Sequence, residues 1–405
     1  MPVNLRLHKL KENVVALGSF KVKTLSLAVS AVILCACQPS SESEQSTQSA
    51  ESQTPAQTQQ SETTQTSMET ANSSQDDKSA GYAEPLVTDI YTADPSAHVF
   101  EGKLYIYPSH DVESGIPQND NGDHFDMRDY HILSMDEVGG EVTDHGVALS
   151  VDDIPWAGRQ LWAPDAAEKD GTYYLYFPLK DKQDVFRIGV ATSDNPAGPF
   201  EPQPEPMANS YSIDPAVFKD DDGEYYMYLG GIWGGQLQRY QTEEYNPKDE
   251  YPADDEAAVK PRIAKLSDDM LSYAEPLREI DILDENGELI TAGDNDRRFF
   301  EAAWVHKYDG KYYFSYSTGD THKIVYATGD NPYGPFTYQG VILEPVEGWT
   351  NHHSIAKYQG KWYLFYHDSS LSGGKTWLRS VKMTELEYRP DGSIVTVAPY
   401  KKKGE

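Results

Sequence analysis

Three carboxylic acids and a histidine stand at corresponding places of a sequence unit that occurs five times. Each copy begins with four residues at the head of a predicted strand: DPSA from Asp94, APDA from Ala163, DPAV from Asp214, EAAW from Glu301 and HHSI from His352. A carboxylate buried among apolar neighbours is costly unless it is paired or used. Like charges in one pocket raise at least one pKa, so one acid can stay protonated while another is ionised. Cleavage of a glycosidic bond requires a pair of this kind.

Each head is followed by a predicted hairpin that ends in glycine and by an aromatic strand. The glycines are Gly102, Gly171, Gly223, Gly310 and Gly360, and the strands after them read KLYIY, TYYLY, EYYMY, KYYFSY and KWYLFY. A second repeat, ATSDNPAGPF at 191–200 and ATGDNPYGPF at 327–336, differs only at its third and seventh positions. It predicts a strand closed by a Pro-Gly turn. Repeats of this kind indicate a repeat architecture.

The repeats place residues 84–405 in one all-β domain. Helical periodicity is nearly absent, and short strands rich in Tyr, Val and Ile alternate with Gly, Pro and Asp turns. Five units fit a five-bladed β-propeller with four strands in each blade plus insertions, whereas the alternative, a β-sandwich, does not require five equivalent hairpins. The innermost strand of every blade faces the central channel, so the head residues should converge on the axis. We expect the acidic insertions 241–260 and 281–298 to be surface loops.

Residues 1–37 are typical of an export signal. Basic residues precede the apolar run 25–34, which is shorter than the roughly 20 residues that span a bilayer. The run ends in Leu34-Cys35-Ala36-Cys37, which resembles a bacterial lipobox and implies cleavage before Cys37 and lipidation of its thiol. The alternative is an ordinary signal peptide cut near Ala36. We expect export across the inner membrane and a lipid anchor in the outer membrane, in the periplasm or at the cell surface, because Gln38 does not resemble an inner-membrane retention signal.

Composition restricts the partners and the chemistry. Residues 38–83 are Ser, Thr, Gln and Glu with almost no large apolar residue, which predicts a disordered linker. The formal charge of −31 argues against nucleic acid or anionic polymers as partners. The only two cysteines lie in the signal, so the domain has no disulfide and no thiolate metal site. We expect no organic cofactor, because no Gly-rich loop stands in a strand-to-helix setting.

The heads TADPSAHVF, LWAPDA, SIDPAVF, FFEAAWV and NHHSI resemble those of glycoside hydrolase family 43, from about Tyr91 to Pro399. The resemblance implies a five-bladed propeller that acts on xylans or arabinans by an inverting mechanism. It makes Asp94 the general base that activates water and Glu301 the general acid that protonates the leaving oxygen. Asp214 would raise the pKa of Glu301 and hold its orientation. The competing interpretation is structural, because Asp-Pro at a strand head is a common turn device.

The same resemblance implies two substrate-binding residues. Trp162 is similar to the family tryptophan that forms a wall of the sugar subsite, although tryptophan is also ordinary core material. Arg379, in WLRSVKM, is similar to the family arginine that reaches a sugar hydroxyl near the acids, and a structural salt bridge is the alternative.

His352 takes the axial place in the fifth repeat, where many family members hold a calcium ion. Calcium prefers oxygen ligands, so a single histidine with mostly water ligands would be an unusual site. The alternative is a hydrogen-bonded histidine on the channel floor. His353 should face away by strand alternation. The pairs His110-Asp111 and His367-Asp368 both follow a Tyr-rich strand, which indicates a repeat feature at a strand end rather than a metal pair.

The resemblance predicts a β-xylosidase in plant or algal polysaccharide breakdown. A secreted, tethered enzyme with a single domain and no recognisable binding module suggests exo action on short oligosaccharides, and an open groove for polymers is the alternative. The first alternative is an α-L-arabinofuranosidase on arabinoxylan or arabinan, because nothing in the motifs separates the two sugars. The second alternative is a non-catalytic glycan-binding propeller on a surface lipoprotein. It would require an axial acid to be missing, and all three acids are present.

Overall fold

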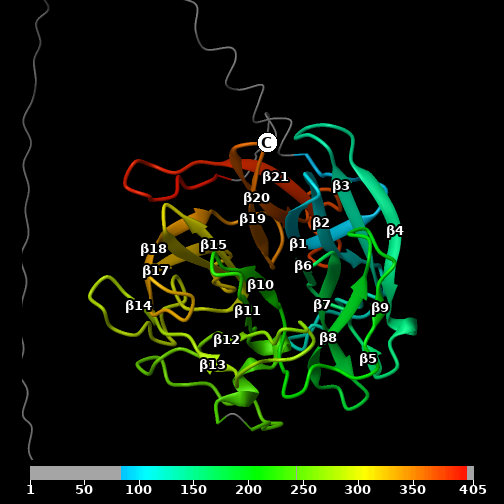
Figure 1. Cartoon of the computed structure of the whole chain (residues 1–405). Coiled ribbons are helices and arrows are strands. Elements are labelled where there is room, and N and C mark those ends of the chain that lie inside the picture. The colour runs from blue at the N-terminus through cyan, green and yellow to red at the C-terminus, as the bar shows by residue number, and fades with distance from the viewer. Residues whose placement is uncertain (1–83, 243, 399–405) are drawn as a thin grey trace, which may run out of the picture. The chain divides into compact units, whose positions relative to one another are not determined.

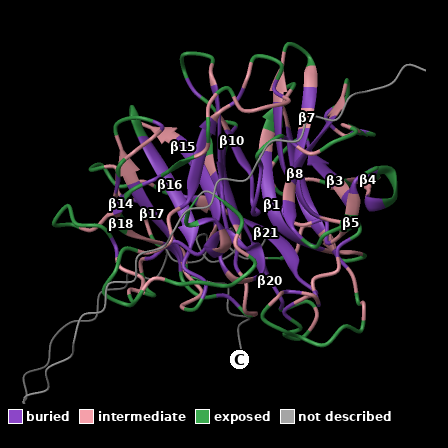
Figure 2. Ribbon diagram, turned by 90° about the horizontal axis from the view of Figure 1, so that it is seen from below, coloured by how far each residue is buried: buried purple, intermediate pink, exposed green. Residues whose placement is uncertain are grey.

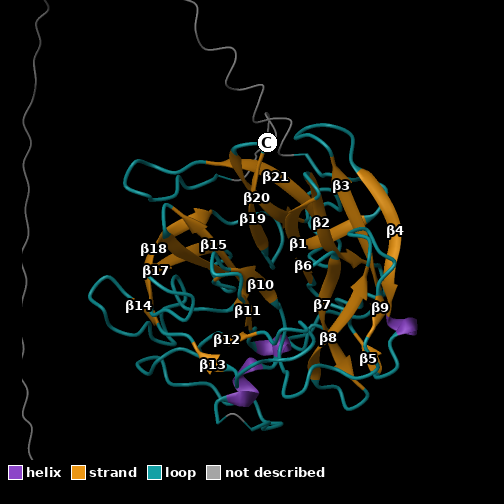
Figure 3. Cartoon of the chain, viewed as in Figure 1, coloured by secondary structure: helices purple, strands orange, loops and turns teal. Residues whose placement is uncertain are grey.

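The five predicted hairpins each form the inner part of a separate β-sheet in the computed structural model, which describes residues 84–242 and 244–398 (Figure 1). The predicted signal with Cys37 and the predicted linker 38–83 lie outside the described residues, so both stay predictions. No helix among the described residues is long and apolar enough to cross a membrane. The only helical segments there are three short 3-10 helices, η1 (Val151–Asp153), η2 (Trp233–Gly235) and η3 (Leu237–Tyr240) (Figure 3).

The sheets follow one another along the chain. The first contains β1 (Tyr91–Phe100), β2 (Lys103–Asp111), β3 (Asp129–Met135) and β4 (Thr143–Ser150). The second contains β5 (Ala157–Arg159), β6 (Asp165–Lys169), β7 (Thr172–Asp181), β8 (Phe186–Ser193) and β9 (Glu201–Pro202). The third contains β10 (Ala216–Lys219), β11 (Tyr225–Leu229), β12 (Arg262–Lys265) and β13 (Arg278–Glu279). The fourth contains β14 (Ile282–Leu283), β15 (Glu301–Tyr308), β16 (Lys311–Ser317), β17 (Ile324–Gly329) and β18 (Phe336–Leu343). The fifth contains β19 (His353–Tyr358), β20 (Lys361–Asp368) and β21 (Ser380–Leu386).

The first strands of the five hairpins form a closed ring. Strand β1 contacts β6, β6 contacts β10, β10 contacts β15, β15 contacts β19, and β19 contacts β1. This closure confirms the five-bladed propeller and excludes the sandwich. The expectation of four strands in every blade is wrong for the fifth blade, whose described part has three, while two other blades carry an additional short strand.

Chain segments from the two ends of the domain close the ring. Leu86 donates its N–H to the carbonyl of Val381 at 2.8 Å, and Thr92 donates to the carbonyl of Arg379 at 2.9 Å. Leu86 and Val87 pack on the apolar cluster that β1, β2, β20 and β21 share. The segment before β1 therefore joins the first blade to the last.

The middle strands of the blades are buried on both faces because neighbouring sheets pack against one another (Figure 2). All five residues of β11 are buried, which explains a run of aromatic residues in place of a strict alternation. The hydroxyl of Tyr107 donates to the carbonyl of Pro196, and that of Tyr228 donates to Pro332, each at 2.7 Å. In both copies of the Asp-Asn-Pro turn, the proline carbonyl thus accepts a hydrogen bond from the hydroxyl of a buried tyrosine in the preceding blade.

The two acidic insertions differ in secondary structure. Residues 241–260 contain no strand or helix among those described and are mostly exposed. The expectation is wrong for 281–298, because Ile282 and Leu283 form β14 and pair in parallel with β18. A strand of two residues is too short to give a hydrophobic period.

Candidate active site

Irregular backbone turns the heads of the blades toward the axis. The β1–β2 pairing shifts between Ala93 and Ser96, and the β15–β16 pairing shifts between Glu301 and Trp304. Within these irregularities the backbone adopts positive φ at Asp94 (49°) and Ala302 (63°), and it does so again at Asp214 (56°), which precedes β10. Non-glycine residues in this region carry a cost of about 1–3 kcal/mol each, which the surrounding structure must offset. Bulges re-aim side chains beside functional sites, and these direct the acids into the channel mouth.

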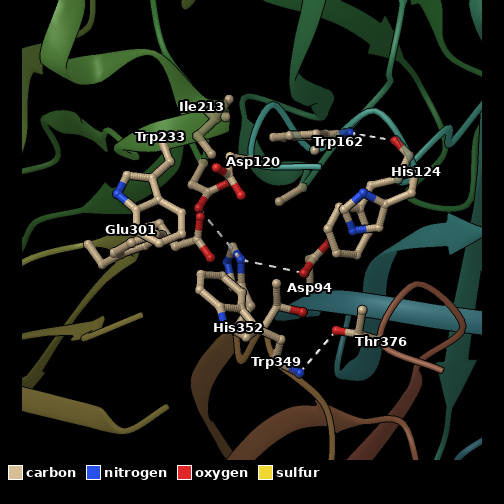
Figure 4. Close-up of a pocket in the computed structure, with 18 of the residues that line it drawn as sticks. Asp94, Asp120, His124, Trp162, Ile213, Trp233, Glu301, Trp349, His352 and Thr376 are labelled. Atoms are coloured by element: carbon tan, nitrogen blue, oxygen red, sulfur yellow. Dashed lines mark hydrogen bonds and ion pairs between the residues drawn. The ribbon is translucent and has the colours of Figure 1, made fainter. Parts of the chain in front are cut away.

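The acids line a cavity of about 410 Å³. Asp94, Asp214, Glu301, His352 and Arg379 all contribute to its wall. Three tryptophans, Trp162, Trp233 and Trp349, also line it, as do residues of the loop between β2 and β3. Figure 4 shows Trp233 and Glu301 on one side of the cavity and Trp162 and His124 on the other. The structure therefore brings together every site residue that the sequence predicts, apart from Cys37, which is not described.

Asp94 is held as a carboxylate. Burial opposes its ionisation, but the positive charge of Arg379 and a hydrogen bond from Ser109 lower the pKa of Asp94 to about 2. Arg379 donates from Nη1 to Asp94 Oδ1 at 2.9 Å, and Ser109 donates from Oγ to Oδ2 at 2.7 Å. Asp94 is thus a permanent anion on the cavity wall.

The backbone of Asp94 has its own partner. Its N–H donates to Nδ1 of His367 at 3.0 Å, and His367 is fully buried. Burial, aided by the charge of Arg379, lowers the pKa of His367 to about 3, so the ring stays neutral and can accept this bond. His367 therefore supports the left-handed conformation of Asp94 from the opposite end of the domain.

Asp214 and Glu301 each have a raised pKa. Burial and the neighbouring carboxylates raise the pKa of Asp214 well above its usual range, and burial and the charge of Asp94 raise that of Glu301 to about 8. The N–H of Ala302 donates to Asp214 Oδ2 at 2.8 Å, which favours the ionised form of Asp214. The hydrogen bond therefore favours the proton on Glu301.

Arg379 forms a buried salt-bridge network. Besides Asp94, its guanidinium binds both carboxylate oxygens of Asp111 at 2.8 Å, and its own N–H donates to Asp111 at 2.8 Å. Nη1 also lies 3.2 Å from Oγ1 of Thr350. Arg379 therefore holds the salt bridge that was the structural alternative, and at the same time it lies on the cavity wall.

His352 lies between two acids. Its Nδ1 is 3.8 Å from Asp94 Oδ1 and 3.8 Å from Asp214 Oδ2. Burial lowers its pKa to about 4, so the imidazole is neutral. His353 is fully buried, does not line the cavity and hydrogen-bonds Oγ of Ser315 at 2.6 Å.

The cavity wall at Trp162 is rigid. The indole Nε1–H donates to the carbonyl of Phe125 at 2.8 Å, and the ring stands edge-on to Phe125 with centroids 6.2 Å apart. Gly122 has φ of +70°, and a Cβ there would lie 2.7 Å from the indole ring. Only glycine fits between the loop and this tryptophan.

A model of glycosyl hydrolases family 43 matches residues 82–394. The chain belongs to this family. It is a glycoside hydrolase, as the arrangement of acids requires.

The names of similar proteins specify activities within family 43. It is 64% identical over 313 residues to a "Xylosidase/arabinosidase" of Bacteroides ovatus, which covers 77% of this chain and 96% of the relative. It is 56% identical over 309 residues to a "Beta-xylosidase" of Xylanibacter ruminicola, covering 76% and 97%. A crystal structure of a GH43 beta-xylosidase/alpha-arabinofuranosidase from a compost microbial metagenome, calcium-free and in complex with xylotriose, has 72% identity and a TM-score of 0.78. That match covers 79% of this chain and 98% of the other.

Sequence reasoning missed several residues of the family 43 site. Asp111 and His367 are at or next to a strand end, as predicted, but each also supports Asp94, directly or through Arg379. Trp233 and Trp349 were not singled out, and their rings stack with centroids 5.5 Å apart. For Asp111 and His367, the sequence offers one signal: each is a charged or titratable residue at the end of a buried, Tyr-rich strand.

Proposed function

We propose that this family 43 enzyme is an inverting, exo-acting β-xylosidase that releases xylose from xylo-oligosaccharides. The observation that carries the proposal is the opposite ionisation of two acids on one cavity, Asp94 as carboxylate and Glu301 as acid. The names of the relatives support the sugar, because all three contain a xylosidase.

The reaction assigns a separate role to each acid. Asp94 accepts a proton from a water molecule, and the water oxygen forms a bond to the anomeric carbon. The glycosidic C–O bond breaks, and its oxygen takes the proton of Glu301. Asp214 is a positioning residue, because it accepts a hydrogen bond from the N–H of Ala302 next to Glu301. The negative charges of Asp214 and Glu301 oppose each other, so an ionised Asp214 would keep Glu301 protonated. Attack from the face opposite the leaving group inverts the anomeric configuration.

Aromatic side chains form much of the cavity wall. The loop 112–128 supplies Phe125, which fixes Trp162, while Trp233 and Trp349 stack elsewhere on the wall. We assign Trp162 to the wall of the subsite that holds the released sugar, since a rigid aromatic face suits a pyranose ring. Arg379 lines the cavity beside Asp94, and a sugar hydroxyl would take the Nη1 donor that bonds Thr350.

Hydrolysis of two aryl glycosides tests the substrate. We expect p-nitrophenyl β-D-xyloside to be hydrolysed with a higher kcat/KM than p-nitrophenyl α-L-arabinofuranoside. The reverse order would favour the α-L-arabinofuranosidase alternative, which two of the relatives' names support. No release from either substrate by the folded protein would refute both enzyme assignments and favour the non-catalytic glycan-binding propeller.

The pH profile of kcat/KM should have a single descending limb, in the neutral to alkaline range. Glu301 acts only when protonated and its pKa is raised to about 8, so kcat/KM should fall as pH rises through this value. Asp94 acts only when ionised and its pKa is about 2, so it should cause no fall between pH 4 and pH 7. Initial rates on p-nitrophenyl β-D-xyloside from about pH 4 to about pH 10 measure the profile. A fall in kcat/KM centred near pH 4.5 with a flat alkaline side would contradict the assignment.

We also propose a calcium ion bound to His352. The residues present fit such an ion only in part, because the described residues place no group of three carboxylate or imidazole ligands around His352, so water must supply the other ligands. The neutral imidazole can act as a ligand. A bound cation would add positive charge near the acids.

Chelation tests this ion. Removal of metal with EDTA should lower kcat on p-nitrophenyl β-D-xyloside, and calcium but not zinc should restore it. The variant His352→Ala should have a reduced kcat that neither EDTA nor calcium changes. Equal activity of the native enzyme before and after chelation would contradict a functional ion here.

We propose, finally, a secreted lipoprotein anchored through Cys37 and separated from the membrane by residues 38–83. The pattern of residues 25–37 supports it. Radiolabelled palmitate should enter the native chain and not Cys37→Ala expressed in a bacterium. Equal labelling of both would refute the anchor.

A further inference from the structure

Two histidines and an aspartate form a cluster at the base of the loop that lines the cavity. His110 is the next-to-last residue of β2, Asp129 is the first residue of β3 and His131 is the third. One potential ligand atom from each lies within 4.8 Å of the other two, and the three side chains are partly exposed. An ion can therefore reach them from solvent. None of them lines the cavity described above.

The hydrogen bonds around His131 are those of a metal ligand. Its Nδ1 hydrogen-bonds the carboxylate of Asp144 at 2.9 Å, which leaves Nε2 directed to Asp129, 3.9 Å from Oδ1. Asp144 is itself held by the N–H of Gly146 at 2.8 Å. Metal-binding histidines almost always donate their other nitrogen to a carboxylate, a carbonyl or water, which fixes the tautomer and the ring orientation. Asp144 provides this support independently of the cluster.

The spacing and ligand types suit a transition metal. Tetrahedral bonds of about 2.0–2.1 Å to zinc place ligand atoms about 3.3 Å apart. In the cluster, His110 Nδ1 lies 2.6 Å and His131 Nε2 lies 3.9 Å from Asp129 Oδ1, on either side of that value. Small side-chain rotations would bring both distances to the spacing of zinc ligands. Imidazole and carboxylate together suit zinc and its neighbours, whereas calcium prefers a shell of oxygens.

We propose that His110, Asp129 and His131 bind a divalent transition-metal ion, with Asp144 as the outer partner of His131, and that the ion joins the two ends of the loop 112–128. His110 and Asp129 flank this loop, and the loop carries His124 and Phe125 into the cavity. A link at the base of a loop removes conformational freedom from the residues between its ends. Bound metal should therefore rigidify the wall against Trp162.

The alternative to a metal site is simple hydrogen bonding. His110 with Asp129 and His131 with Asp144 can be two hydrogen-bonded pairs that need no ion. Binding of the metal itself separates these possibilities, because paired histidines without a common ligand would bind zinc no better than other exposed histidines do.

The test uses the purified full chain without a histidine tag, stripped with EDTA and titrated with zinc chloride by calorimetry. We expect one equivalent to bind, and we expect that binding to be lost in His110→Ala and His131→Ala. Asp144→Ala should weaken it about 10- to 100-fold. The matched control is His145→Ala, an exposed histidine in β4 of the same blade, which should bind as the native protein does. If His110→Ala does not fold, His110→Gln replaces it.

A second readout tests the loop. Zinc should slow amide hydrogen exchange within 112–128 in the native chain and in His145→Ala but not in His131→Ala. Absence of zinc binding, or equal binding by His131→Ala, would overturn the site. Zinc binding with unchanged exchange in 112–128 would overturn its role at the loop.

Discussion

Replacing Asp94 with asparagine is expected to lower kcat/KM by about 10²–10⁴-fold on xylobiose and by a similar factor on aryl xylosides. Asparagine has nearly the same shape but cannot accept the proton of the attacking water. The loss should not depend on the leaving group, because the water must be activated for every substrate. Steady-state rates on xylobiose and on 2,4-dinitrophenyl β-D-xyloside provide the comparison.

The fold should survive this change, because Arg379 keeps its bonds to Asp111. The matched control is Asp220→Asn, which alters a buried aspartate that binds Lys307 and Tyr312 and does not line the cavity. It should keep native kcat/KM. If Asp94→Asn retained more than a tenth of native activity with an unchanged thermal midpoint, Asp94 would not be the base.

Replacing Glu301 with glutamine should separate the two substrates. Glutamine has no acidic proton, so hydrolysis of xylobiose, whose leaving oxygen must be protonated, should fall by about 10²–10⁴-fold. Hydrolysis of 2,4-dinitrophenyl β-D-xyloside should fall far less, because dinitrophenolate leaves without a proton. Asp94→Asn, which shows no such difference, is the control.

The same variant should lose the alkaline limb of the pH profile on the activated substrate, because the group whose pKa burial raises to about 8 is gone. An equal loss on both substrates, with the alkaline limb unchanged, would assign the proton to another residue.

The sequence predicts the parts of the site that recur. Asp94, Asp214 and Glu301 stand at the heads of repeated hairpins, so one alignment of the repeats with each other places them on the axis. The ring of first strands confirms this placement. Trp162 and Arg379 needed the family resemblance, because neither stands out by spacing.

The parts that do not recur were beyond prediction. His367 reaches Asp94 across 273 residues and Arg379 across 285, and no local pattern reports such a contact. The bulge within β1 depends on pairing with β2, which the hairpin period alone does not show. The two-residue strand β14 and the three-stranded last blade depend on tertiary packing in the same way.

The most direct test of the inverting mechanism with Asp94 as base and Glu301 as acid is the configuration of the first xylose released. Proton NMR can follow the anomeric signals during rapid hydrolysis of p-nitrophenyl β-D-xyloside, which releases only one xylose, before mutarotation mixes the anomers. Water delivered by Asp94 on the face opposite Glu301 should give α-xylose first, with β-xylose appearing only as the anomers equilibrate. Initial release of β-xylose would mean retention through a covalent intermediate and would contradict the roles assigned to both acids.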